Sequence, residues 1–193
     1  MPPKQRITRE MILERSFEMF CREGMEVVNA RSVAKALNCS TQPIFSYFSG
    51  MEDLKNALEL KAKELFESAL KVEDQPGDPM MNICKAYVSF ATEQPCLFTH
   101  LFMLNKDDPL YPFISKEERH ALVEREAAYL NLPFEVAGKI FVQMSVYCHG
   151  LAAVRAAHKA NFTMDEMAVM IENTHKMTVF SLRCCMEHPE VCK

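Results

Sequence analysis

The sequence has little of what marks β-sheets, membrane spans or secretion. Its 193 residues include only 5 glycines and no alternating runs of β-branched residues, which argues against a sheet and predicts an all-α fold. No apolar run reaches the roughly eighteen residues of a membrane-spanning helix. The opening stretch MPPKQRITRE has no apolar core of the kind found in secretory signals, so we expect a cytoplasmic protein.

Enzyme motifs are missing as well. The chain has no GxSxG elbow, P-loop, GxGxxG after a strand or HExxH, and we therefore expect it not to be an enzyme. Its 8 cysteines never occur as CxxC, a spacing typical of zinc sites, so we predict no metal ion and no cofactor. We expect reduced, inert thiols. The alternative is a thiol- or metal-responsive sensor that uses the C-terminal cysteines between Cys184 and Cys192.

What the sequence does contain is a pair of short helical patterns. Residues 29–48, NARSVAKALNCSTQPIFSYF, divide into two such patterns separated by a polar break. Asn29 and Ser40 are each expected to be helix N-caps, because their side-chain oxygens can accept a backbone N–H of the first turn. Asn38 tolerates the left-handed conformation that ends a helix. This spacing predicts a helix-turn-helix, whose second helix lies in the DNA major groove.

The second helix of the pair has the pattern of a helix that reads DNA. Ile44 and Phe48 fall on one face at helical spacing, so they are expected inside. Pro43 suits the first turn, where a missing N–H costs nothing. The outward face then carries short polar and aromatic side chains, namely Thr41, Gln42, Ser46 and Tyr47.

The charge distribution agrees with a DNA-binding head. Residues 1–51 carry seven lysines and arginines against five acidic residues, a net charge of +2, whereas the whole chain has −4, which leaves −6 for the remainder. A basic head on an acidic body is expected where only one end meets phosphate. Lys4, Arg6 and Arg9 precede the first helix and either contact phosphate or the minor groove, or form an ordinary soluble terminus.

From Thr8 to Leu58 the sequence resembles the DNA-binding domain of the tetracycline-repressor (TetR) family. The positions that carry the resemblance keep the family's register without a gap: Ile12, Leu13, Ser16, Phe20, Gly24, Val33, Ala34, Ser40, Ile44, Phe45, Tyr47, Phe48, Glu52, Asp53 and Leu54. It implies a helix-turn-helix DNA-binding domain at residues 1–51 and an effector-binding and dimerisation domain at 52–193, with about nine helices. It also implies a transcriptional repressor that binds its operator as a homodimer and is released by an apolar small-molecule inducer.

Within this head we predict two kinds of DNA contact. The side chains expected to meet base edges are Thr41, Gln42 and Ser46, and Gln42 can form a bidentate pair with adenine. The groups expected to hold phosphates are Lys4, Arg6, Arg31, Tyr47 and Lys55, and Pro43 completes the interface.

Two positions depart from the family pattern. Met51 stands where a lysine is common, and Phe45 stands where a tyrosine is common. The loss of one cation and one hydroxyl leaves open a third hypothesis, a helical interaction protein whose head no longer binds DNA.

The body of the chain predicts further helices, at about 52–72, 79–93, 96–104, 116–130, 134–159 and 163–186. The helix at 134–159 is apolar over most of its middle, and a helix that is apolar nearly all round must be buried on both sides. The resemblance implies that this helix and the last one pack against their copies in a second subunit as a four-helix bundle. A two-fold dimer would also supply the paired heads that a pseudo-palindromic operator needs.

The body is also rich in methionine and phenylalanine, of which the chain has 14 and 13. These side chains either wall an apolar ligand pocket, which flexible methionine suits well, or are simply core. The predicted lining is Phe98, Phe102, Met103, Tyr111, Phe113, Met144, Tyr147, Cys148 and His149. His149 is either a ligand contact or a hydrogen-bonded histidine of the core.

Overall fold

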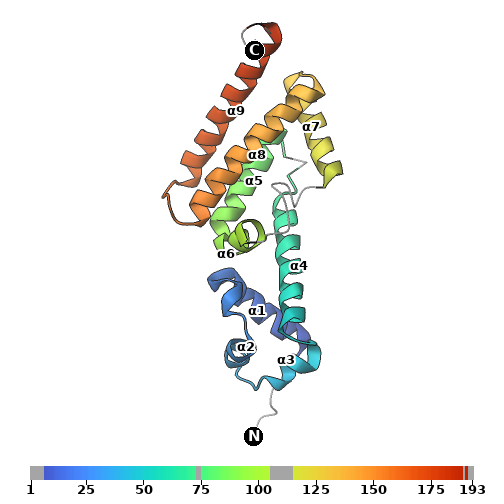
Figure 1. Cartoon of the computed structure of the whole chain (residues 1–193), viewed down its shortest axis with the longest axis vertical. Helices are drawn as coiled ribbons and strands as arrows, with labels where there is room; N and C mark the ends of the chain where they lie inside the picture. Colours follow the sequence, from blue (N-terminus) through green and yellow to red (C-terminus); the bar gives the residue numbers. More distant parts are fainter. Residues whose placement is uncertain (1–6, 73–74, 105–114, 189, 191–193) are drawn as a thin grey trace. The chain divides into compact units, whose positions relative to one another are not determined.

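The structure is a computed structural model, and it describes residues 7–72, 75–104, 115–188 and 190 (Figure 1). Within these ranges the chain forms nine α-helices and two short helical segments of other types, without a strand, which confirms the all-α prediction. None of the helices described there is long and apolar enough to cross a membrane.

The described residues form two compact units. The first holds those within Met1–Phe66 and Gln94–Asn105, and the second holds those within Glu67–Glu93 and Lys106–Lys193. The assignment of DNA binding to residues 1–51 and of effector binding to residues 52–193 stays a prediction.

Local capping signals set the helices of the first unit. Thr8 caps the first helix through Met11 N–H (3.2 Å), and Gly24 ends it at φ 94°, where glycine is favoured. Ile12 and Phe20 face the core on that helix, and Ile44, Phe48, Leu54 and Leu58 complete it. The helices are α1 (Arg9–Glu23), η1 (Met25–Val27), α2 (Ala30–Ala36), α3 (Gln42–Tyr47), α4 (Met51–Ala69), α6 (Pro95–Phe98) and the π-helical η2 (Thr99–Leu104). The end of α4, from Glu67 on, belongs to the second unit.

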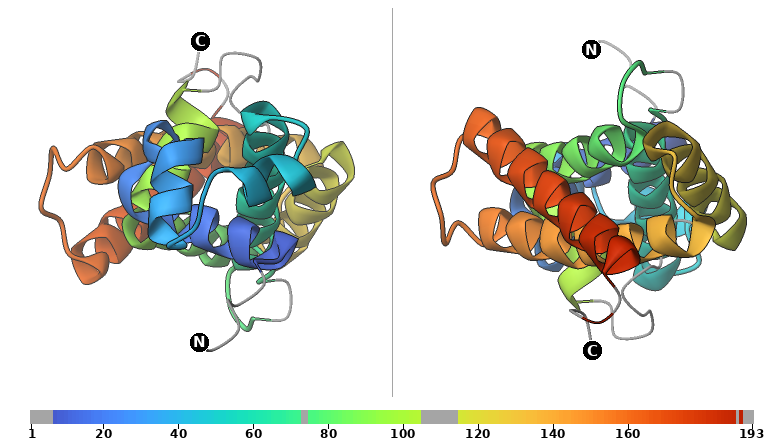
Figure 2. Two further views of the ribbon diagram at one scale, coloured as in Figure 1. Left: turned by 90° about the horizontal axis from the view of Figure 1, so that it is seen from below. Right: turned by 90° about the horizontal axis from the view of Figure 1, so that it is seen from above.

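The second unit is a bundle of four helices (Figure 1): α5 (Pro79–Glu93), α7 (Lys116–Leu130), α8 (Phe134–Ala156) and α9 (Met164–Glu187). Capping boxes are present at the start of α7, between Ser115 and Glu118, and at the start of α9, between Thr163 and Glu166. α8 contacts α5, α7 and α9, and α9 lies across α8 when the chain is viewed from above (Figure 2). Since α8 touches three helices, its mostly apolar sequence is explained in part within its own unit.

Some local predictions differ from the structure. The helix at 134–159 ends at Ala156, because His158 takes a left-handed φ of 53° and the N–H of Lys159 bonds back to the carbonyl oxygen of Val154 (3.0 Å). The segment 96–104 begins as α6 and continues as the π-helical η2. Six of the described cysteines are free, whereas Cys185 is disulfide-bonded, so the expectation of reduced thiols does not hold there.

Candidate functional site

The first candidate site is the helix-turn-helix of α2 and α3. α2 begins with a reciprocal capping box in which Ser32 N–H donates to Asn29 Oδ1 (3.0 Å) and Asn29 N–H donates to Ser32 Oγ (3.1 Å). After α2, Asn38 adopts φ 50°, as predicted, and the chain turns toward α3. The prediction that Ser40 caps α3 is wrong. The N-cap is Thr41, whose helical dihedral angles (φ −73°, ψ −15°) replace the extended ones that a capping side chain needs.

α3 has one buried face and one exposed face. Ile44 and Phe48 are 0% and 1% exposed, which anchors the helix against α1. The face opposite carries the predicted DNA-contacting side chains, of which Gln42, Ser46 and Tyr47 are exposed and Thr41 and Pro43 are half-buried. The Ser46 hydroxyl donates to the Gln42 carbonyl oxygen (3.0 Å), so in this arrangement its lone pairs are available to accept from a base amino group.

Tyr47 also ties α3 to the start of the described chain. Its hydroxyl donates to the carbonyl oxygen of Ile7 at 3.2 Å. The guanidinium of Arg9 lies 4.9 Å from the centroid of the Phe48 ring, a second link between the same two segments. The predicted phosphate contacts Lys4 and Arg6 lie outside the described residues.

The remaining residues of the predicted interface differ in solvent exposure and in ion pairing. Arg31 is exposed on α2, whereas Lys55 on α4 is half-buried, with its Nζ 4.0 Å from Glu52 Oε1. Phe45, at the position where a tyrosine is common, is 52% exposed on α3. Met51 is the first residue of α4 and is half-buried.

The predicted ligand-lining residues fall in both units. In the first unit Phe98 is buried, and its ring stacks on that of Phe102 (centroids 4.7 Å apart), while Met103 is 46% exposed. In the second unit Met144 and Cys148 are buried on α8. Tyr147 is half-buried, and Tyr111 and Phe113 lie outside the described residues. That these residues line one pocket stays a prediction.

His149 is hydrogen-bonded, with its Nδ1 2.9 Å from the hydroxyl of Tyr87 on α5. Burial lowers the pKa of His149, so the ring is neutral near pH 7. Burial raises the pKa of Tyr87, and the nearby Cys148 adds to this effect, so the hydroxyl keeps its proton and can donate it to Nδ1.

A cluster that sequence reasoning missed lies in the second unit. It joins Asp78 at the start of α5, Glu126 on α7 and His175 on α9. His175 Nε2 is 2.8 Å from Glu126 Oε1, and His175 Nδ1 is 3.4 Å from Asp78 Oδ2. Glu126 and His175 are buried on faces that are otherwise apolar: α7 also buries Leu122, and α9 also buries Ile171. A charged residue within an apolar stripe was the available signal.

The three charges of this cluster affect one another. Burial raises the pKa of Glu126 more than the hydrogen bond to His175 lowers it. Burial by itself would lower the pKa of His175, but the hydrogen bond to Glu126 and the charges of Asp78 and Glu126 outweigh it, and the pKa of His175 is raised.

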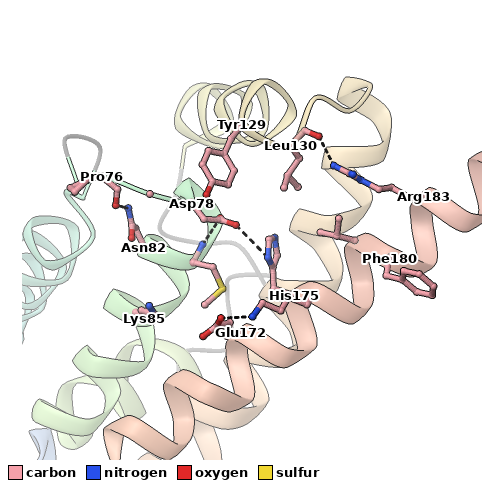
Figure 3. Close-up of a pocket in the computed structure, with 14 residues that line it drawn as sticks. Pro76, Asp78, Asn82, Lys85, Tyr129, Leu130, Glu172, His175, Phe180 and Arg183 are labelled. Carbon is pink, nitrogen blue, oxygen red and sulfur yellow. Dashed lines mark hydrogen bonds and ion pairs between the residues drawn. The ribbon is translucent and has the colours of Figure 1, made fainter.

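A pocket of about 590 Å³ opens beside this cluster. Figure 3 shows His175 directed toward Asp78, with Tyr129 and Lys85 on neighbouring helices. Three cationic side chains line it: Lys85, Lys176, which is paired with Glu172, and Arg183, which donates to the Leu130 carbonyl oxygen at 2.6 Å (Figure 3). Of the predicted ligand-lining residues that the structure describes, none belongs to it.

Comparison with known proteins identifies the fold. No family model matches the chain. The uncharacterized HTH-type transcriptional regulator YobS of Bacillus subtilis (strain 168) is 28% identical over 98 residues, which cover 49% of this chain and 51% of that protein. The chain therefore aligns with about half the length of this curated relative.

Two solved structures share the architecture over nearly the whole chain. A TetR-like transcriptional regulator from Rhodococcus sp. RHA1 has a TM-score of 0.59 at 16% identity and covers 88% of this chain and 96% of its own. The fatty acid degradation regulator FadR from Bacillus halodurans has a TM-score of 0.50 at 13% identity and covers 91% and 97%. With its helix-turn-helix and its all-α body, the chain has the fold of the TetR-like transcriptional regulators.

Proposed function

We propose that the protein is a transcriptional repressor that binds operator DNA as a homodimer through α3 and leaves it when an apolar small molecule binds. The observation that carries this proposal is the two-sided character of α3. Ile44 and Phe48 are buried in the core of the first unit, and polar side chains at groove-reading positions face outward. The TetR-like fold and the curated regulator of Bacillus subtilis support the same function.

The exposed side chains of α3 have separate roles in this proposal. Gln42 pairs with an adenine edge, and Thr41 and Ser46 contact neighbouring bases, which together supply sequence discrimination. Phosphates are held by Arg31, Lys55 and the basic arm before α1, which consists of Lys4 and Arg6. These contacts supply most of the affinity and make binding salt-dependent. Lys55 contributes after its long contact with Glu52 opens, since a 4.0 Å pair between solvent-accessible groups is weak.

The proposed homodimer is supported by apolar side chains that are exposed on α8 and α9. On α8, Val142, Val146 and Val154 are 50%, 54% and 39% exposed, and their spacing places them along one ridge. On α9, Met177 and Phe180 are 72% and 75% exposed. Exposed apolar rows on adjacent helices are the pattern of a helix–helix interface, and a two-fold pairing of this face would form a four-helix bundle.

The proposed inducer is an apolar small molecule that contacts the residues predicted to line the ligand pocket. Such a ligand releases DNA only through its differential affinity for the two states of the dimer. We would screen apolar compounds for those that raise the melting temperature and dissociate the DNA complex. Tyr147→Ala is expected to weaken the response, whereas Tyr129→Ala, which alters the 590 Å³ pocket instead, is expected to leave it unchanged. The opposite pattern would contradict the assigned lining.

The experiment that tests DNA binding uses fluorescence anisotropy with a labelled duplex from upstream of the protein's own gene, over a series of salt concentrations. We expect saturable, sequence-dependent binding that weakens steeply with salt. Gln42→Ala is expected to lose about 1–3 kcal/mol per base pair read, as for other bidentate contacts. Asn161→Ala, at an exposed position between α8 and α9, is the matched control and is expected to bind like the wild type.

A folded protein that prefers no sequence, even after selection from a pool of random duplexes, would remove the proposed function. Binding unchanged by Gln42→Ala and Tyr47→Ala would instead remove α3 as the reading helix.

A further inference from the structure

We propose that Asp78, Glu126 and His175 bind one divalent transition-metal ion of the zinc class. The three side chains come from α5, α7 and α9, and each offers a ligand atom within 4.8 Å of the others. Two carboxylates and an imidazole form a donor set that suits zinc and its neighbours, whereas magnesium and calcium prefer oxygen ligands alone. The inference does not depend on the proposed DNA-binding function.

The distance between His175 and Asp78 favours this interpretation. Nδ1 and Oδ2 face each other at 3.4 Å, longer than the 2.7–2.9 Å that is roughly typical of a charge-assisted hydrogen bond. Two ligand atoms at about 2.0–2.2 Å from a tetrahedral ion lie about 3.3–3.6 Å apart, which matches the observed separation. Glu126 Oε1 lies 2.8 Å from Nε2, whose lone pair points away from Nδ1, so Glu126 reaches an ion at Nδ1 only when its side chain turns away from Nε2.

Both carboxylates are held in place by the backbone of α5. Asp78 Oδ1 accepts from Met81 N–H (3.0 Å), and Glu126 Oε2 accepts from Met80 N–H (3.2 Å). Each carboxylate thus uses one oxygen for the backbone and directs the other at His175. Hydrogen bonds of this kind orient metal ligands in many proteins.

Burial gives the cluster a reason to take up a cation. The side chains of Glu126 and His175 are 0% and 5% exposed, and that of Asp78 is 16% exposed. A buried carboxylate is costly unless a cation compensates it, and a divalent ion would compensate these carboxylates and join three helices of the second unit.

The ion would have an open side. Asp78 and His175 both line the 590 Å³ pocket, so coordination positions beyond the three protein ligands face a cavity (Figure 3). Zinc sites with three protein ligands and an open position bind water or a small ligand there, whereas purely structural sites are closed by four. We therefore assign an accessible metal site to the cluster.

The test is titration of the full-length, chelator-treated protein with Co²⁺ and Zn²⁺ ions, followed by absorption spectroscopy and isothermal calorimetry. We expect one ion per chain and a cobalt spectrum of nitrogen and oxygen ligands, without a thiolate charge-transfer band. Asp78→Asn is the sharpest variant, because asparagine caps a helix as well as aspartate does and α5 should remain folded. It is expected to weaken binding at least about tenfold.

Two matched controls and a second variant separate this site from others. His175→Asn is expected to lose binding as Asp78→Asn does, with an unchanged circular dichroism spectrum in at least one of the two. His120→Asn, at an exposed histidine beside Glu124, and Cys184→Ser are expected to bind like the wild type. A thiolate band, binding abolished by Cys184→Ser, or no uptake at tenfold excess of metal would each overturn the proposal and leave the cluster as an ion-paired histidine.

Discussion

The hydroxyl of Tyr47 donates a hydrogen bond to the carbonyl oxygen of Ile7, forty positions earlier in the chain, at 3.2 Å. Tyr47 belongs to the candidate reading helix, and Ile7 directly follows the basic residues predicted to contact phosphate. The phenol donates a single hydrogen, so the bond to Ile7 and a bond to phosphate exclude each other. We therefore predict that Tyr47 fixes the backbone at Ile7, just before α1, in addition to, or in place of, contacting DNA directly.

Tyr47→Phe tests this assignment. The variant keeps the ring but loses the bond to Ile7, so we expect weaker operator binding with an unchanged preference among sequences, because the base-reading side chains are untouched. Anisotropy with the operator and with scrambled duplexes measures both quantities. A changed sequence preference would show that Tyr47 reads a base.

The basic arm predicts a change in salt dependence. Replacing both Lys4 and Arg6 by alanine should reduce the slope of log K against log salt concentration by about 0.9 for each phosphate that is no longer neutralised, hence by roughly 2. Lys116→Ala with Lys159→Ala, two exposed lysines of the second unit, is the charge-matched control and should leave the slope unchanged. Equal slopes for the arm variant and the wild type would mean that the arm is an ordinary soluble terminus.

The capping box of α2 predicts a loss of stability in the head. Asn29→Ala removes the acceptor for Ser32 N–H and should destabilise the fold by about 0.5–2 kcal/mol. Asn29→Asp keeps an acceptor and should cost much less. Urea denaturation followed by circular dichroism compares the three proteins, and equal midpoints for Asn29→Ala and the wild type would contradict the cap's contribution.

The exposed apolar row of α9 predicts how the dimer can be broken. Phe180→Glu places a charge at a side chain that is 75% exposed in one chain, so the monomer should still fold while dimerisation is lost. Sedimentation equilibrium measures the mass, with Glu64→Lys on α4 as a surface-charge control. A dimer that survives both Phe180→Glu and Val146→Glu would place the interface elsewhere.

His149 predicts a pH dependence of stability. Burial lowers its pKa from the ordinary 6.5. Just below pH 6.5, His149 is therefore protonated in the unfolded chain but still mostly neutral in the folded chain. The contribution of His149 to the free energy of unfolding is fully present above pH 6.5, and it declines as the pH falls toward the lower pKa of the folded state. The urea midpoint of His149→Gln should fall less between pH 7.5 and 5.5 than that of the wild type. His120→Gln, at an exposed histidine, serves as the control and should behave like the wild type.

Much of the fold could be predicted from the sequence because its signals are local. The caps at Thr8, Asn29, Ser115 and Thr163 all act within three residues, and that of Asn29 lies where the sequence pattern placed it. Ser40 failed as a cap for a reason outside this pattern, since the dihedral angles of Thr41 decide where α3 begins. The two-sided character of α3 also followed from spacing alone, because Ile44 and Phe48 lie four residues apart.

The cluster of Asp78, Glu126 and His175 was decided by the tertiary structure. These residues are 48 and 49 positions apart, and no periodicity in one helix reveals which residue of another helix it will meet. The same holds for Tyr47 with Ile7 and for Tyr87 with His149. The sequence by itself determined the helices, their caps and their inward faces, because hydrogen bonding and burial along one helix depend on neighbours in the chain. The packing of separate helices determined which polar groups share a buried site, because that depends on contacts between residues far apart in the chain.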